Sequence, residues 1–361
     1  MAELLKNYYN PTTIASLAFQ IAKVYPEFES EKFQKSILNA EWEMLGLKQR
    51  MRKISTQIEA FLPFDYPKQI EILKSVAPNF SGFTAMLFPD FVEVFGLSHF
   101  DISIDALTFF TQHSSSEFAV RPYLLKFPKK MYQQHLHWSK HENYHVRRLA
   151  SEGIRPRLPW AMAIPDLKKN PTPIFPILEN LKNDESEYVR RSVANNLNDI
   201  SKDHPEIVLE IAEKWKGKSD FTDKIVKHAL RGLLKKGNAK ALSIFGMNQE
   251  NHFEVSDFKV SKNNLKIGDF FHFEFKITSK SADNQKLRLE YKIAFRKANG
   301  TLSKKVFQIS EQQIAPNATL KVYKKHAFAD LTTRKHYPGE HQIFVVANGI
   351  EIAEILFVLS E

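Results

Sequence analysis

The sequence predicts two architectures in series: an all-α solenoid of paired-helix repeats, followed by an all-β sandwich. Three observations lead to this prediction. Apolar residues recur at three- and four-residue spacing up to about residue 246. A basic helical motif returns after about 40 residues. From residue 253 the pattern changes to alternating apolar residues, rich in β-branched and aromatic side chains.

The composition of the 361 residues is that of a globular protein, since 43% are hydrophobic. The absence of cysteine excludes disulfides, thiolate metal sites and a cysteine nucleophile. Glycine occurs 12 times, and neither a G-x-G-x-x-G nor a G-x-x-x-x-G-K-[ST] motif is present. The N-terminus does not look like a secretory signal, and no apolar run approaches the ~20 residues of a membrane span. We therefore expect a cytoplasmic protein with no membrane partner.

Residues 1–246 are expected to form the helical domain. The spacing of Ile14, Leu17, Ala18 and Ile21 places these side chains on one face of a helix. Prolines fall between the predicted helices, where they end them. These breaks are at Pro63, Pro67, Pro78, Pro128 and Pro205.

The helical domain repeats itself. YHVRRLASEGI (144–154) matches EYVRRSVANNL (187–197) at an offset of 43 residues, and KIVKHALRGLL (224–234) is a looser third copy. FAVRPYL (118–124) is a degenerate earlier copy. A period near 40 of paired helices is typical of a HEAT-like solenoid. Each of the three later copies places a basic pair at the same point of its second helix, so stacking would align the pairs along one concave face.

These basic pairs predict contacts with a phosphate backbone. Residues 121–160 contain nine Lys/Arg and two Asp/Glu, within a chain of net charge +10. Such a cluster favours a nucleic-acid surface over a solvated basic face. For each single arginine the alternative is packing against the neighbouring repeat. The expected DNA-binding residues are Arg121, Arg147, Arg148, Arg155, Arg157, Arg190, Arg191, Lys227, His228 and Arg231.

Residues 253–361 are expected to form an immunoglobulin-like sandwich of about seven strands. The Asn-Gly pairs in ANGT (298–301) and ANGI (347–350) are hairpin signals. Strand-like segments include FFHFEFKITS (270–279), KLRLEYKIAF (286–295) and EHQIFVVANG (340–349). We expect the sandwich to clamp DNA opposite the solenoid through basic loops, and the alternative is a module for stability or protein interaction. The loops concerned are 279–286, 296–305 and 332–341.

Several motifs together resemble those of a known family. Residues 1–246 resemble the HEAT-like DNA alkylation repair glycosylases, most of all the AlkC branch, some members of which carry an immunoglobulin-like domain. The motifs are WEMLGLKQRMRKI (42–54), SSSEFAVRPYL (114–124), YHVRRLASEGIRPRLPWA (144–161), YVRRSVANNLNDISKDHP (188–205) and IVKHALRGLLKKG (225–237). The resemblance implies hydrolysis of the N-glycosidic bond of cationic alkylated bases in double-stranded DNA, without a deep base-flipping pocket. The implied substrate is 3-methyladenine above all, with 3-methylcytosine as a second candidate. We expect no metal or other cofactor, and see no evident obligate protein partner.

The resemblance also implies a catalytic set. It comprises Glu117, Glu152, Asp199 and Trp160. Chemistry supports the set, because breaking this bond moves positive charge onto the deoxyribose, where a carboxylate stabilises it. Each acid also has a structural alternative: a helix N-terminal acid for Glu117, neutralisation of neighbouring arginines for Glu152, and a helix or turn cap for Asp199. For Trp160 the alternative is a place in the core, which we expect for the other three tryptophans.

Two further hypotheses compete with this one. His137, His141 and His145 are spaced to share one face of a continuous helix, which would permit a metal site. No H-E-x-x-H motif accompanies them, so phosphate contact or a solvated face is favoured. The whole chain is alternatively a HEAT-repeat protein that recognises DNA structure without chemistry, or a protein-interaction scaffold. The acids beside the basic pairs favour the enzyme, because a phosphate binder gains nothing from them.

Overall fold

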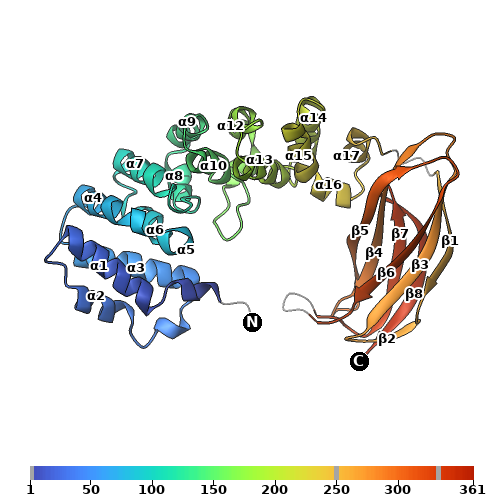
Figure 1. Cartoon of the computed structure of the whole chain (residues 1–361), viewed down its shortest axis with the longest axis horizontal. Coiled ribbons are helices and arrows are strands. Elements are labelled where there is room, and N and C mark those ends of the chain that lie inside the picture. Colours follow the sequence, from blue (N-terminus) through green and yellow to red (C-terminus); the bar gives the residue numbers. More distant parts are fainter. Residues whose placement is uncertain (1–3, 248–251, 331–334) are drawn as a thin grey trace. The chain divides into compact units, whose positions relative to one another are not determined.

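The structure is a computed structural model that describes residues 4–247, 252–330 and 335–361. The chain divides into two compact units, Met1–His204 with Gly217–Ala229, and Pro205–Lys216 with Leu230–Glu361. The predicted order of helical repeats followed by a β-sandwich is confirmed (Figure 1). No helix among the described residues is both long and apolar enough to cross a membrane.

The first unit consists of helices and short turns of 3₁₀-helix. Its α-helices are α1 (Pro11–Val24), α2 (Ser30–Ile37), α3 (Leu47–Phe61), α4 (Tyr66–Val76), α5 (Gly82–Ala85), α6 (Leu87–Phe95), α7 (Phe100–Phe110), α8 (Val120–Lys126), α9 (Pro128–Trp138), α10 (Tyr144–Glu152), α11 (Pro165–Lys169), α12 (Phe175–Leu181), α13 (Glu187–Ile200) and α15 (Asp220–Ala229). Its 3₁₀ turns are η1 (Leu5–Tyr8), η2 (Trp42–Met44), η3 (Ala77–Asn79) and η4 (Thr172–Ile174). The four apolar residues predicted to share a face of α1 are its buried residues.

The two close copies of the repeat form α10 and α13, which pack against each other, and α13 packs in turn against α15. The third copy does not form one continuous helix. Helix α15 ends at Ala229, and α16 (Arg231–Lys235) begins after Leu230. The break falls inside the motif, so its basic pair lies on α15 whereas Arg231 belongs to the second unit.

Helix α10 is fixed at both ends. Asn143 caps the first turn, because its side chain accepts a hydrogen bond from the His145 N–H at 2.8 Å. Gly153 ends the helix where there is no room for a side chain, since a Cβ there would lie 2.8 Å from Val120 Cγ2. Behind the helix, His135 of α9 is fully buried and its Nδ1 donates to the carbonyl of Ala150 at 2.9 Å. These contacts set the position of the residues at the end of α10.

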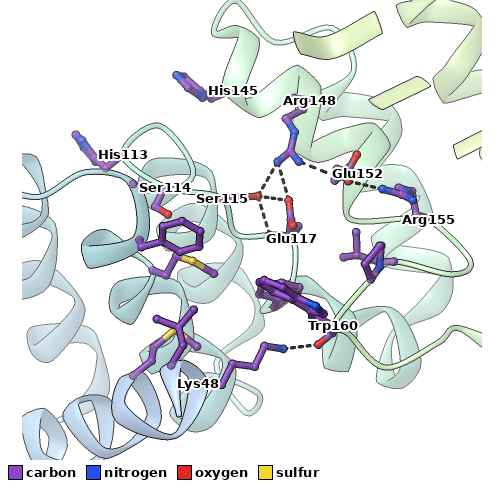
Figure 2. Close-up of a pocket in the computed structure, with 18 of the residues that line it drawn as sticks. Lys48, His113, Ser114, Ser115, Glu117, His145, Arg148, Glu152, Arg155 and Trp160 are labelled. Carbon is purple, nitrogen blue, oxygen red and sulfur yellow. Dashed lines mark hydrogen bonds and ion pairs between the residues drawn. The ribbon is translucent and has the colours of Figure 1, made fainter. Parts of the chain in front are cut away.

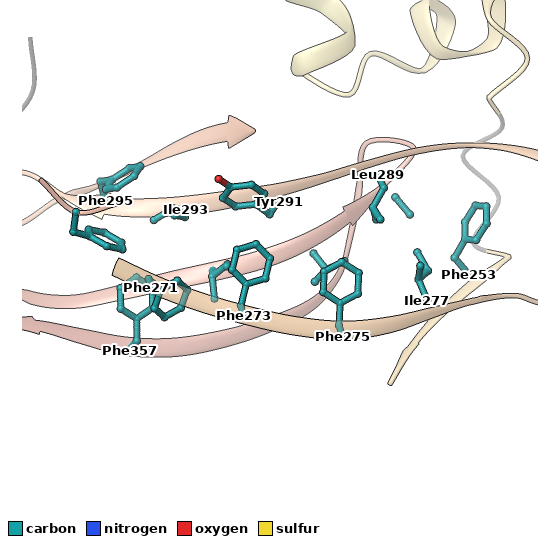
Figure 3. Close-up of a cluster of buried hydrophobic side chains, with 14 of the residues drawn as sticks. Phe253, Phe271, Phe273, Phe275, Ile277, Leu289, Tyr291, Ile293, Phe295 and Phe357 are labelled. Atoms are coloured by element: carbon teal, nitrogen blue, oxygen red, sulfur yellow. The ribbon is translucent and has the colours of Figure 1, made fainter. Parts of the chain in front are cut away.

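The second unit contains α14 (Pro205–Trp215), α16, α17 (Ala239–Ile244) and the sandwich. The strands are β1 (Phe253–Val260), β2 (Asn264–Lys266), β3 (Phe270–Ser279), β4 (Gln285–Arg296), β5 (Leu302–Ile314), β6 (Thr319–Ala327), β7 (Gly339–Ala347) and β8 (Ile350–Ser360). They form a three-stranded sheet in the order β1-β3-β6 and a five-stranded sheet in the order β2-β8-β7-β4-β5. Alternate residues Phe271, Phe273, Phe275 and Ile277 of β3 point into the core between the sheets (Figure 3).

Both predicted hairpins are present. Strands β7 and β8 pair up to Ala347 and Ile350, so Asn348 and Gly349 form a two-residue loop, with φ of 46° and 84°. Positive φ at both loop positions is what the Asn-Gly signal predicts. Strands β4 and β5 are joined by the longer loop that contains Gly300, whose φ is 78°. Of the three basic loops, 332–341 begins in residues that lie outside the described part of the chain.

Because His135 is buried, we expect the stability of the protein to depend on pH. Burial lowers the pKa of His135 to about 4 from 6.5, so it stays neutral in the folded state. Between these two values the unfolded chain binds a proton that the folded chain does not. The free energy of unfolding is therefore fully maintained above about pH 6.5 and falls as the pH drops toward 4.

His135→Gln should flatten this part of the stability profile, although the variant is less stable at neutral pH because the packing against α10 changes. The measurement is the thermal midpoint by circular dichroism, followed through that pH window. His137→Gln is the matched control, because His137 is exposed on the same helix. An unaltered slope in His135→Gln would contradict the assignment.

Candidate active site

A cavity of about 570 Å³ opens in the first unit, beside the C-terminal end of α10. One wall is charged and carries Glu117, Arg148, Glu152 and Arg155. Trp160 lies at the edge of this wall (Figure 2). The opposite wall is apolar and comes from the N-terminal helices and the segment after α7. Its residues are Leu47, Met51, Phe83, Met86 and Phe118.

The charged wall is an alternating row of acids and bases. Arg148 Nη1 donates to Glu117 Oε2 at 2.7 Å, and its Nη2 lies 3.5 Å from Glu152 Oε1. Arg155 Nη1 donates to Glu152 Oε1 at 2.6 Å, and its Nε donates to Asp199 Oδ2 at 2.8 Å. Each carboxylate is therefore bound to at least one guanidinium, and each guanidinium lies between two carboxylates.

Glu152 occupies the centre of this row. Its side chain is 6% exposed, and Ser192 donates to its second oxygen, Oε2, at 2.6 Å. Both carboxylate oxygens are thus held, one by arginines and the other by a hydroxyl from α13. A carboxylate with fixed oxygens at the wall of a partly enclosed cavity is a preorganised negative charge, which stabilises a developing cation better than mobile water does.

The arginines stay charged in this setting. Burial opposes their charge, but the carboxylates outweigh it. The neighbouring Glu117 and Glu152 raise the pKa of Arg148, and Glu152 and Asp199 raise the pKa of Arg155. The guanidinium of Arg148 also lies 4.5 Å from the centroid of the Tyr188 ring.

Asp199 is placed differently from the other two acids. It is buried, with 3% of its side chain exposed, and it does not line the cavity. Arg155 separates it from the cavity, and Lys202 donates to its other oxygen at 2.9 Å. The structure therefore brings Glu117 and Glu152 together at the surface of the cavity. Asp199 lies behind Arg155 and does not reach that surface.

Trp160 is not a core residue, whereas Trp42, Trp138 and Trp215 are buried as expected. It lines the open cavity with 66% of its surface exposed. Its φ is 63°, a region that a bulky aromatic residue seldom adopts. Backbone strain of this kind costs on the order of 1–3 kcal/mol, and such strain is concentrated at functional sites.

Arg121 lies in the core and differs from the expected contact with DNA. It is fully buried, and its guanidinium donates to the carbonyls of Gly153, Arg155 and Met162 at 2.6–3.1 Å. Burial lowers the pKa of Arg121 to about 10. Its contacts hold the loop that follows α10, so we assign it a structural role in positioning Arg155.

The two arginines of each repeat motif make different contacts. The first arginine of each pair binds the loop before its own helix. Arg147 Nη1 donates to the carbonyls of His141 and Glu142. Arg190 Nη1 donates to the carbonyls of Asp184 and Glu185, which are the equivalent residues of the next repeat, 43 positions later. Each also contacts the next repeat, since Arg147 pairs with Asp184 and the Arg190 guanidinium lies 3.8 Å from the centroid of the Phe221 ring. These contacts fit the alternative in which the arginine packs against the neighbouring repeat.

The second arginine of each pair lies elsewhere. Arg148 faces the cavity, whereas Arg191 is exposed and paired with Glu187 at 2.6 Å. Arg157 is half-exposed and bound to Asp203 by two hydrogen bonds. On α15, Lys227 is exposed and His228 Nε2 lies 2.9 Å from Asn195 Oδ1.

The histidine series does not form one helical face. Helix α9 ends at Trp138, so His137 is separated from His141 and His145 by a turn. His141 Nδ1 accepts a hydrogen bond from the Asn143 N–H, and His145 lines the cavity. Among the described residues, no three His, Asp or Glu side chains are arranged to hold a metal ion.

Several residues of the candidate site were not predicted from the sequence. Ser192 could have been found, because it stands 43 residues after Leu149, at a position that is apolar in the first repeat. Ser115 lies in the serine run before Glu117 and donates to Glu117 Oε2 at 2.7 Å. The apolar wall carried no usable signal, because Phe83 and Met86 follow the same pattern as core residues.

Comparison with known proteins identifies the family of the chain. Residues 111–233 match the family model described as DNA alkylation repair enzyme, and residues 254–361 match the C-terminal Ig-like domain of YhaZ. The chain is 47% identical to YhaZ of Bacillus subtilis (strain 168) over 345 residues, 96% of each chain. It is 36% identical to the Pseudomonas fluorescens alkylpurine DNA glycosylase AlkC, solved bound to DNA containing an abasic site analog. That match has a TM-score of 0.96 and covers 99% of this chain and 100% of the other.

The fold and the site define a HEAT-like DNA alkylation repair protein, and the chain belongs to the AlkC-like branch of this family, with its C-terminal immunoglobulin-like domain.

The different contacts of the first and second arginines predict different effects when each is replaced by alanine. Arg147→Ala and Arg190→Ala should lower stability, because each leaves loop carbonyls without a donor. For the partly buried Arg147–Asp184 pair we expect a loss of roughly 3 kcal/mol in unfolding free energy. Arg191→Ala should leave stability unchanged and reduce the dependence of duplex binding on salt by about one unit of log–log slope. Denaturant unfolding and salt titrations of binding measure the two effects. An Arg190→Ala variant with normal stability and a reduced salt slope would instead indicate that Arg190 contacts DNA.

Proposed function

We propose that this protein is a DNA glycosylase that hydrolyses the N-glycosidic bond of cationic alkylated bases, chiefly 3-methyladenine. The observation that carries the proposal is Glu152, a carboxylate fixed on both oxygens at the wall of an open cavity beside an exposed tryptophan. The Pseudomonas fluorescens relative is an alkylpurine DNA glycosylase that was solved bound to DNA, which supports the reaction class and DNA as the partner. A protein with this function would act with the nucleoid.

The chemistry follows from the charge of the substrate. A base alkylated at N3 carries a positive charge and leaves as a neutral molecule, so little help from a general acid is needed. The base departs with the bonding electron pair, and the deoxyribose acquires oxocarbenium character. Water then adds to C1′ and loses a proton, which completes the hydrolysis. In the proposed mechanism Glu152 stabilises this charge, and Glu117 provides a second carboxylate in the same cavity. The indole of Trp160 stacks on the cationic base or contacts the sugar.

The roles of the remaining residues follow from their contacts. Arg148 and Arg155 hold Glu152 in place and keep the local charge balanced, so that the carboxylates do not repel the phosphates of the duplex. Asp199 acts through Arg155, because it does not line the cavity. We infer that it is a positioning residue, while Glu117 and Glu152 contact the reacting nucleotide.

Incubation of the protein with methylated duplex DNA tests the proposal directly. The released bases are identified by chromatography, which also determines whether 3-methylcytosine or 7-methylguanine is removed in addition to 3-methyladenine. Binding of duplex without release of any base would favour the alternative, a HEAT-repeat protein that recognises DNA structure without chemistry.

Glu152→Gln should reduce the rate of base release by ~100-fold or more, because the neutral amide cannot stabilise the cationic transition state. Duplex binding should persist, since the variant removes no positive charge. Single-turnover excision and a binding titration measure the two quantities. Glu71→Gln is the control: it removes a carboxylate that pairs with Lys68 in the same unit but outside this cavity. A Glu152→Gln variant that excises at the normal rate would overturn the assignment.

We propose further that the sandwich contributes to DNA affinity through its basic loops. The test uses charge substitution in the full chain, because the compact unit that holds the sandwich also includes helices of the solenoid. Lys297→Gln, in the exposed β4–β5 loop, should lower the salt slope of duplex binding by about one unit without changing excision at saturating enzyme. Lys262→Gln, an equally exposed charge change elsewhere in the sandwich, serves as the control. Equal salt slopes of duplex binding in wild type and Lys297→Gln would show that this loop does not contact DNA.

A further inference from the structure

Trp160 adopts a backbone conformation that its residue type disfavours. Pro159 precedes it in a turn that is closed by the Ala161 N–H donating to the carbonyl of Leu158 at 3.3 Å. With φ of 63°, Trp160 occupies the left-handed position that turns of this kind normally give to glycine or asparagine. A large aromatic residue remains there only when its surroundings fix it.

A lysine from a distant part of the chain contacts this turn. Lys48 is on α3, 112 residues earlier, and its Nζ donates to the carbonyl of Trp160. The ammonium group also lies 4.0 Å from the centroid of the Phe118 ring, which fixes the direction of the lysine side chain. All three residues line the same cavity, and Figure 2 shows Lys48 beside Trp160 at the edge opposite Arg148.

The position of Lys48 is not explained by its own helix. It is the second residue of α3, in the first turn, where the helix dipole favours acidic side chains over basic ones. Nor does the lysine form an ion pair with a carboxylate in the described part of the chain. Its hydrogen bond to Trp160 is the one that its side chain donates among the described residues. Arg121 holds the same loop at three other carbonyls, so Lys48 completes the support of the loop at its strained residue.

We propose that Lys48 is a positioning residue, which holds Trp160 in the left-handed conformation and so directs the indole into the cavity beside Glu117 and Glu152. Without the ammonium donor, the Trp160 backbone is free to leave the left-handed region, and the indole samples several orientations. The catalytic consequence rests on the proposed glycosylase function. The conformational consequence does not, and is measured without DNA.

The first measurement follows Trp160 in the free protein by ¹⁹F NMR after labelling with 5-fluorotryptophan. The chain has four tryptophans, and Trp160 alone is exposed, so its resonance is distinct and is assigned with Trp160→Phe. Lys48→Met should shift or broaden that resonance and leave the other three unchanged. Lys48→Arg, which keeps a cationic donor, should restore it. The matched control is Lys53→Met, which removes the same charge from the same helix, where Lys53 binds Asn39.

The second measurement is single-turnover excision at saturating enzyme. Lys48→Met should slow it roughly 10- to 100-fold, the scale expected when a reacting geometry is displaced by about 1 Å. The double variant of Lys48→Met with Trp160→Ala should be no slower than Trp160→Ala alone, because both act through one side chain. Lys48→Arg should recover most of the rate. Circular dichroism confirms that each variant is folded, which the exposure of Lys48 favours.

The outcomes separate the alternatives. If Lys48 contacts a DNA phosphate instead, Lys48→Met lowers the salt slope of binding while the Trp160 resonance and the saturating rate stay as in wild type, and the proposal is wrong. If the wild-type protein excises no base, the proposed function fails, yet the resonance still decides whether Lys48 positions Trp160.

Discussion

The site depends on one physical arrangement, the row of buried carboxylates and guanidinium groups that runs from Glu117 through Arg148, Glu152 and Arg155 to Asp199. A buried carboxylate is costly unless it is paired and hydrogen-bonded. The residues of the row come from four segments: the loop before α8, helix α10, the loop after it, and α13. Each segment must therefore reach its correct place before the charges of the others are compensated. This couples the packing of the repeats to the geometry of the cavity.

Much of the fold was predictable from local patterns. The 43-residue offset identified α10 and α13, and the Asn-Gly pair at 348–349 identified the two-residue hairpin between β7 and β8. The hairpin signal depends on two adjacent residues and the repeat signal on the recurrence of a short motif, so neither requires knowledge of tertiary contacts. The break after Ala229 was not predicted, because the apolar spacing continues across it through Leu230 and Leu233.

The site was predictable only in part, and the reason is again physical. Sequence indicated which residues carry charge, but pairing is set by tertiary contacts. Glu117 and Glu152 do share the cavity, whereas nothing in the sequence indicated that Arg155 separates Asp199 from it. The left-handed conformation of Trp160 and its contact with Lys48 likewise depend on segments 112 residues apart. No local pattern contains that information.

The pairing also changes what the basic cluster at 121–160 means. Its five arginines bind partners within the protein, and most of the acids come from outside the cluster. Arg121 binds carbonyls. Arg147, Arg148, Arg155 and Arg157 pair with Asp184, Glu117, Glu152 or Asp199, and Asp203, respectively.

A segment that is strongly positive in sequence is thus close to neutral where it meets the cavity. That neutrality suits the proposed chemistry. A bare basic wall would attract phosphates into the place that a cationic base has to occupy, and it would raise the energy of the positive charge that develops on the sugar. On the proposed function, we expect phosphates to be bound by cations away from the row, such as Arg191 and the exposed lysines. The arginines of the row serve instead to hold two carboxylates fixed at the cavity.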